Sequence, residues 1–197
     1  MLGLKLPTDP RWVNIVEKNI EEILTDHAYC EQKAASNAIS IIVKFAEYPD
    51  LVKAMTEICQ EEMEHFGMVH DKIQERGLKL GFERKDPYVN DLASYLKKRN
   101  SGGGSRADRF VNRMMFAAMI EARSCERFRI LSEEINDEDL REFYRSLMES
   151  EARHYTTFLN FARKYGQGID VEQRWQEFLE YEATLMEKYG TSETMHG

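Results

Sequence analysis

Four stretches of this 197-residue chain carry an apolar stripe at alternating spacings of three and four residues, and each stripe has a glutamate near its middle. Such spacing is typical of a helix that turns one face to a bundle core. Only 4 prolines and 11 glycines interrupt the chain, which suits long helices better than many short strands. The sequence therefore predicts an all-α fold with four acidic side chains in its core: Glu31, Glu62, Glu121 and Glu151.

Helix-start and helix-stop residues divide the chain. Asp9-Pro10 opens a helix expected to reach about residue 48, and a second helix is expected from about 51 to 76, ended by Gly77. A crossover at 78–105 contains a short helix, opened by Asp86-Pro87, and a flexible Ser-Gly-Gly-Gly-Ser segment at 101–105. Helices at about 106–134, 138–165 and 171–189 follow, the last two capped by Asp137 and Asp170. This order predicts a four-helix bundle with one long crossover and an additional C-terminal helix.

The length of the chain favours a single domain over residues 1–197. The last eight residues, 190–197, are expected to form a flexible tail, because they follow a glycine and carry no apolar stripe. They contain a Glu-x-x-His pair, Glu193 and His196, which we discount as a ligand pair for the same reason.

Two histidines lie beside the core glutamates. His65 follows Glu62 by three residues and His154 follows Glu151 by three, which places each imidazole on the same helix face as its carboxylate. A buried carboxylate without a partner costs several kcal/mol even after relaxation. Four such groups in one small core therefore require positive charge between them, and the six side chains predict a metal site.

The ligand spacing is repeated within the chain. Glu31 and Glu62 are separated by 31 residues, and Glu121 and Glu151 by 30. The first helix pair thus recurs in the second, which predicts a site with two similar halves.

The donor set indicates which metal such a site holds. Four carboxylates and two imidazoles suit two divalent iron ions, with manganese as an alternative, whereas structural zinc favours thiolates and calcium favours oxygen donors alone. Glu-x-x-His on two helices plus one Glu from each of two others resembles the ligand set of ferritin-like di-iron carboxylate proteins. The predicted ligands are Glu31, Glu62, His65, Glu121, Glu151 and His154.

Two further residues lie next to the predicted ligands. His27 sits one turn before Glu31, and we interpret it as a hydrogen-bonded core residue rather than as a ligand. Glu61 directly precedes Glu62 and is a candidate for orienting a ligand histidine through its second ring nitrogen.

The charge distribution bears on possible partners. The formal net charge of −8 argues against a general nucleic-acid coat protein. However, residues 96–113 hold six basic side chains against one acid, Asp108. The acidic total therefore leaves a local basic run, which consists of Lys97, Lys98, Arg99, Arg106, Arg109 and Arg113. Without a signal-like N-terminus or a spanning apolar stretch, we expect a cytoplasmic protein with no membrane contact.

The residues around the ligands resemble one family within the ferritin-like superfamily, the bacterial tRNA-(2-methylthio-isopentenyladenosine) hydroxylases. The resemblance extends over nearly the whole chain, including the crossover and the total length. It is carried by HAYCEQKAAS at 27–36, EEMEHF at 61–66, IEARSCERF at 120–128 and EARHY at 151–155.

This resemblance implies a di-iron monooxygenase that hydroxylates the isopentenyl side chain of a modified adenosine beside the tRNA anticodon. It implies that Glu31, Glu62 and His65 bind one iron, that Glu121, Glu151 and His154 bind the other, and that carboxylates bridge them. Dioxygen would be the co-substrate, the anticodon stem-loop the partner, and a reductase or ferredoxin the electron donor. The basic run would then be an RNA-binding surface that faces the tRNA phosphates; the alternative is a solvated linker. We expect a monomer or small oligomer.

Three other classes share these features in part. A ferritin-like ferroxidase or iron-storage protein would have the same ligands but would assemble into shells. A rubrerythrin-like peroxidase is disfavoured because the sequence has no cysteine pairs for a rubredoxin centre. A hydroxylase of quinone precursors would want an apolar surface helix for the membrane, and the sequence shows none.

Overall fold

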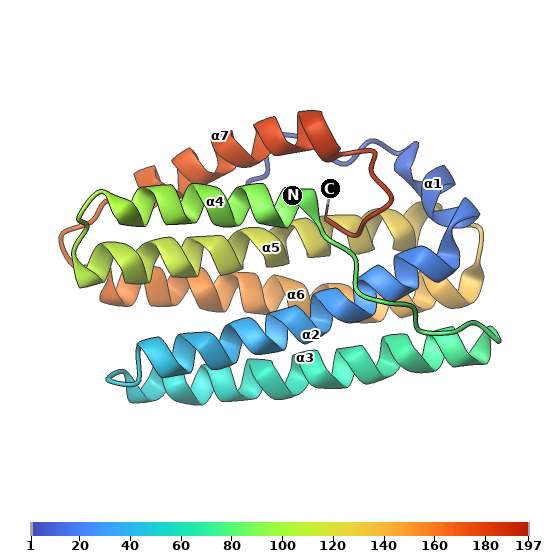
Figure 1. Ribbon diagram of the computed structural model, residues 1–197, viewed down its shortest axis with the longest axis horizontal. Coiled ribbons are helices and arrows are strands. Elements are labelled where there is room, and N and C mark those ends of the chain that lie inside the picture. Colours follow the sequence, from blue (N-terminus) through green and yellow to red (C-terminus); the bar gives the residue numbers. More distant parts are fainter. Residues whose placement is uncertain (1, 197) are drawn as a thin grey trace. The chain divides into compact units, whose positions relative to one another are not determined.

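The computed structural model describes residues 2–196, and all regular secondary structure within them is helical (Figure 1). The expected order of two long helices, a crossover with a short helix, two long helices and a last helix is confirmed. The helices are α1 (Trp12–Lys18), α2 (Ile20–Lys44), α3 (Pro49–Glu75), α4 (Pro87–Ser101), α5 (Arg106–Glu134), α6 (Glu138–Tyr165) and α7 (Val171–Tyr189).

Side-chain caps fix most of the helix starts that the sequence predicts. The carboxylates of Asp86, Asp137 and Asp170 each accept a hydrogen bond from the backbone N–H group three residues later in the chain. The distances are 3.1, 3.0 and 2.9 Å. Ser105 and Asp108 form a reciprocal capping box at the start of α5. Gly77 follows α3 with φ of +67°, the left-handed conformation expected of it.

The first expected helix is divided, which the sequence did not indicate. It breaks at Asn19 and ends at Lys44, so that α1 and α2 replace one helix of residues 10–48. Contacts of α1 explain the break: the ring of Trp12 packs under the guanidinium of Arg127 at 3.9 Å, and Glu17 accepts two hydrogen bonds from Asn136, each of 2.8 Å. Asparagine is a weak helix former, so the helix is interrupted at that residue.

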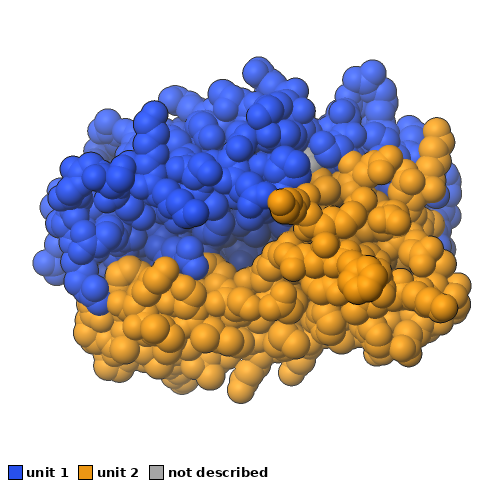
Figure 2. All heavy atoms as spheres, in the orientation of Figure 1, with its two compact units in different colours: residues 1–17, 86–192, 196–197 blue, residues 18–85, 193–195 orange. Residues whose placement is uncertain are grey.

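The chain forms two compact units, which Figure 2 colours separately. Unit 2 comprises residues 18–85 and 193–195, in which α2 and α3 pack along one another as an antiparallel pair. The crossover segment contacts α2 through Gly81, whose N–H donates to the Thr25 hydroxyl at 3.2 Å and whose carbonyl accepts from the Tyr29 hydroxyl at 3.1 Å.

Unit 1 comprises residues 1–17, 86–192 and 196–197. In it α5 and α6 form a second antiparallel pair, and α4 and α7 pack on α5 and on each other (Figure 1). Helix α5 is consequently buried on more than the one predicted face. Its buried residues include Arg123, Glu126 and Arg127, which lie outside the apolar stripe.

The tail differs from the expected flexible segment. Met195 and His196 are buried. The Met195 N–H donates to the Asp26 carboxylate at 2.7 Å, and His196 Nε2 lies 3.1 Å from the Ser124 hydroxyl. Polar contacts to the backbone and to one histidine hold this segment, so an apolar stripe was not needed to anchor it. Residue 197 lies outside the described residues.

Among residues 2–196, no helix is both long enough and apolar enough to span a membrane.

Candidate metal centre

Unit 2 brings together the three ligands predicted on its two helices. One donor atom from each of Glu31, Glu62 and His65 lies within 4.8 Å of the others. His65 Nδ1 lies 3.3 Å from a Glu62 oxygen on the same turn of α3 and 3.9 Å from a Glu31 oxygen on α2. All three side chains are buried. We call this set the α2–α3 half-site.

Unit 1 repeats the arrangement on α5 and α6. One donor atom from each of Glu121, Glu151 and His154 lies within 4.8 Å of the others, and His154 Nδ1 is 3.9 Å from a Glu121 oxygen. These side chains are buried as well. This α5–α6 half-site has the same two carboxylates and one imidazole, as the repeated spacing predicts.

The donor chemistry of each half-site fits a divalent metal ion. Two carboxylates held this close at a buried position repel one another, and burial disfavours their charged forms. A divalent cation between them offsets both effects, and the neighbouring imidazole supplies a nitrogen donor. Iron and manganese accept this mixed oxygen and nitrogen set, whereas no thiolate lies in either set to favour structural zinc.

His27 makes the two half-sites unequal. Its ring is fully buried, and its Nε2 lies 2.6 Å from Glu31 Oε1, one helical turn away. The structure thus places it in contact with a predicted ligand, as a hydrogen-bonded core histidine. The matching position in the α5–α6 half-site, four residues before Glu121, is Ala117. Glu61 is half-buried beside Glu62, and its orienting role stays a prediction.

The basic run divides into exposed and inward-facing members. Lys97, Lys98, Arg106 and Arg109 are exposed. Arg99 is held by Glu177 at 2.6 Å and by the Tyr95 hydroxyl at 2.9 Å. Arg113 is half-buried with its guanidinium over Phe116 at 5.6 Å, and burial lowers the pKa of Arg113. The RNA-binding role of this run stays a prediction, best suited to its exposed members.

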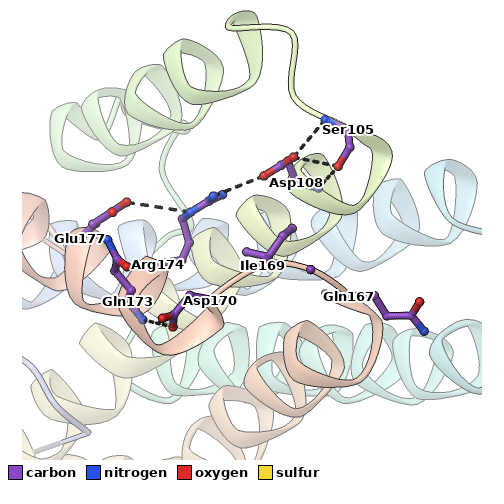
Figure 3. A pocket seen from close by; sticks show the side chains of 9 residues that line it. Ser105, Asp108, Gln167, Ile169, Asp170, Gln173, Arg174 and Glu177 are labelled. Atoms are coloured by element: carbon purple, nitrogen blue, oxygen red, sulfur yellow. Dashed lines mark hydrogen bonds and ion pairs between the residues drawn. The ribbon is translucent and has the colours of Figure 1, made fainter.

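A polar pocket of about 290 Å³ lies where the starts of α5 and α7 meet the α6–α7 loop (Figure 3). Arg174 crosses it, 3.3 Å from Asp108 and 3.9 Å from Glu177. The carboxylates therefore neutralise the only cation among the residues that line it. Both helix starts are capped by their own side chains, so this pocket does not have the character of an anion site.

Unit 1 also contains a buried charged network that the sequence analysis missed. Arg123 donates to Glu182 at 2.6 and 2.9 Å and to Glu126 at 2.9 Å, and Tyr88 donates to Glu182 at 3.2 Å. Arg123 also donates to the Leu6 carbonyl at 3.0 Å, which ties the N-terminal segment to α5. The sequence feature that could have predicted this network is the spacing of three residues between Arg123 and Glu126, which favours an ion pair on a helix.

In both Arg123 and Glu182, burial and the charge of the partner shift the pKa in opposite directions. Burial opposes the charge of Arg123, but Glu182 and its neighbours raise the pKa of this guanidinium overall. Burial raises the pKa of the Glu182 carboxyl more than Arg123 lowers it. Two short N–H donors on one carboxylate oxygen indicate an ion pair.

Comparison with known proteins gave matches over most of the chain. A model of the family described as tRNA-(MS2IO6A)-hydroxylase (MiaE) matches residues 2–197. The tRNA 2-(methylsulfanyl)-N(6)-isopentenyladenosine(37) hydroxylase of Pseudomonas putida is 35% identical over 85% of this chain and 78% of that protein. The protein of the same name from Salmonella typhimurium is 29% identical over 93% of this chain and 83% of that one.

A solved structure also matches. It is described as Protein 43 with aldehyde deformylating oxygenase activity from Synechococcus. Its TM-score to this chain is 0.88 at 31% sequence identity, and the match covers 98% of this chain and 95% of that one.

Proposed function

The chain belongs to the tRNA-(MS2IO6A)-hydroxylase family, and from this we propose that it is a di-iron, dioxygen-dependent monooxygenase acting on tRNA. Its substrate would be 2-methylthio-isopentenyladenosine, hydroxylated on the isopentenyl side chain. The solved structure that it matches has the ferritin-like fold, so the expected all-α, ferritin-like class is confirmed. The observation that carries the proposal is the pair of buried half-sites, each with two carboxylates and one imidazole.

The six predicted ligands would hold the two metal ions. Glu31, Glu62 and His65 would bind one, and the α5–α6 half-site would bind the other. Iron held by these residues would supply the dioxygen activation that hydroxylation of a C–H bond requires. In the balanced reaction one oxygen atom enters the C–H bond and the other leaves as water, which consumes two electrons and two protons. A reductase or ferredoxin is the proposed source of these electrons.

The protein's own side chains would position and insulate this chemistry. Burial of all six ligands excludes bulk water from them. His27 would act as a positioning residue, because its N–H group fixes one oxygen of Glu31 and leaves the other for metal. Glu61 is proposed to orient a ligand histidine in the same way. Since both helix pairs contribute equivalent ligands, we propose that residues 1–197 act as one domain.

The role of His27 can be tested by metal affinity. His27→Ala should weaken iron binding at the α2–α3 half-site by about 10- to 100-fold, as losses of ligand-orienting groups do. His27→Gln keeps an N–H donor and should recover part of that affinity. Equal iron affinity of the Ala variant and the wild type would refute the role.

Substrate binding is proposed to involve the exposed part of the basic run. Lys97, Lys98, Arg106 and Arg109 would contact phosphates of the anticodon stem-loop, while a splayed base enters the site. Because tRNA is the proposed substrate, we propose a cytoplasmic location. We propose a monomer or small oligomer rather than a shell.

Nucleoside mass spectrometry tests the function directly. Anaerobically iron-loaded protein, a reductant and dioxygen should add one oxygen atom to the modified adenosine of tRNA lacking this hydroxyl. With labelled dioxygen, the added atom should carry the label. Glu62→Ala should abolish the product, whereas Lys53→Gln, at an exposed position of α3, should not. Turnover of a free aldehyde but not of tRNA would favour the chemistry named for the Synechococcus protein instead.

A further inference from the structure

A groove between α4 and α7 in unit 1 belongs to neither half-site. It has a volume of about 610 Å³ and is lined by Ser94, Tyr95, Lys98, Arg99 and Tyr181. That volume falls within the range of sites that bind small molecules, about 300–1,000 Å³. No predicted metal ligand lines it, so any occupant would be distinct from the reacting group.

Two tyrosines form the aromatic part of this groove. The rings of Tyr95 and Tyr181 stack with centroids 4.1 Å apart and an angle of 9°. Phe178 packs edge-on against Tyr95 at 5.2 Å, which fixes that ring from a second side. Both tyrosines are half-exposed, so part of the stack is open to solvent. A rigid, partly exposed aromatic stack is the kind of surface on which unpaired bases stack.

The charges around the groove leave a cation for a phosphate. The nearby acids are engaged: Glu177 pairs with Arg99 at 2.6 Å, and Asp91 pairs with Lys188 at 3.1 Å and with the Tyr189 hydroxyl at 2.8 Å. Within residues 2–196 the ammonium of Lys98 has no ion-pair partner. It lies three residues after Tyr95, on the same face of α4.

An aromatic stack with an adjacent free ammonium complements one unit of single-stranded RNA, a base joined to a phosphate. We propose that this groove binds an unpaired nucleotide of the tRNA substrate other than the one that is hydroxylated. This inference rests on the proposed function, because that function requires the chain to hold an RNA. It assigns Tyr95 and Tyr181 to the base and Lys98 to the phosphate.

Binding of a labelled anticodon stem-loop RNA tests this without any turnover. Tyr181→Leu keeps an apolar side chain but removes the stacking surface, and it should weaken RNA binding by at least about fivefold. Tyr181→Trp keeps a large ring and should bind within about twofold of the wild type. Because only stacking is changed, the dependence of binding on salt should be the same in all three proteins.

The role of the Lys98 ammonium is tested by a separate substitution; because Lys98 is exposed, the change should not disturb folding. Lys98→Gln should lower the slope of log affinity against log salt by about 0.7–0.9, the change expected for one lost phosphate contact. Lys53→Gln removes the same charge from α3 and should leave the slope unchanged. Circular dichroism of each variant establishes that its helices are formed.

The results separate this inference from the function on which it rests. Weaker RNA binding by Tyr181→Leu together with a reduced slope for Lys98→Gln supports the groove, whether or not the wild type hydroxylates the RNA. Unchanged RNA affinity in both variants would overturn it, even if tRNA is hydroxylated normally. If the variants bind RNA normally but are reduced more slowly by the electron-donor protein, the inference is also overturned, because the groove would then bind that protein.

Discussion

Removing Arg123 should destabilise unit 1 far more than removing a surface charge. The guanidinium is fully buried and makes three hydrogen bonds to the carboxylates of Glu182 and Glu126. Arg123→Met keeps most of the side-chain volume but leaves two buried carboxylates without their main cation. Breaking a buried ion pair on one side costs about 3–5 kcal/mol. We expect a loss of about 4 kcal/mol, a large part of the roughly 5–15 kcal/mol that stabilises a typical domain.

The same variant should show a distinct dependence on pH. Burial already raises the pKa of Glu182, and removing Arg123 raises it further. Between the usual carboxyl pKa and this raised value the folded state binds more protons than the unfolded state, so stability increases as the pH falls. The penalty of Arg123→Met should therefore shrink when the pH is lowered from 7 toward 5.

Urea denaturation with a double-mutant cycle measures this effect. Arg123→Met combined with Glu182→Met should recover much of the loss, because replacing both members of a buried pair by apolar groups is often nearly neutral. Lys53→Ala removes one partner of an exposed pair and should cost below about 1 kcal/mol. A loss below about 1 kcal/mol for Arg123→Met, or no recovery in the double variant, would refute the reasoning.

Three further predictions concern the ligands, a helix cap and a thiol. Glu62→Ala and Glu151→Ala should each abolish metal binding at their own half-site, measured by metal analysis, while far-ultraviolet circular dichroism shows the helices unchanged; retention of both metals would contradict the ligand assignment. Asp137→Ala removes the side chain that caps α6 and should cost about 1 kcal/mol in urea denaturation, and no loss would argue against the cap. Burial, aided by Glu151, raises the pKa of the Cys125 thiol to about 12, so it should resist alkylation at pH 8 while the half-buried Cys30 and Cys59 react, as mass spectrometry of native protein would show.

The sequence predicted those features that local rules determine. Asp137 and Asp170 cap helices because their side chains reach backbone N–H groups three residues on, which requires no knowledge of the fold. Glu62 and His65 share a face because helical geometry places residues three apart side by side. For the same reason the buried residues of α3 recur at spacings of three and four: Leu51, Met55, Ile58, Glu62, His65, Val69 and Ile73.

Features that depend on contacts between distant segments were not predictable in this way. Within unit 1, Trp12 of α1 packs against Arg127 of α5, more than one hundred residues later in the chain. The tail is held by Asp26 and Ser124, and the groove forms because Tyr95 meets Tyr181. Each depends on contacts between segments far apart in the chain, which no periodicity within a single helix specifies.

The number and identity of the bound metal ions test the central claim most directly. Protein loaded anaerobically with ferrous iron and freed of unbound metal should contain about two irons per chain, because two equivalent half-sites each offer two carboxylates and an imidazole. Mössbauer spectra should show both irons with oxygen and nitrogen ligands, and His27 beside Glu31 should make the two signals unequal. A single ion per chain, or tightly bound zinc with thiolate ligands, would contradict the account.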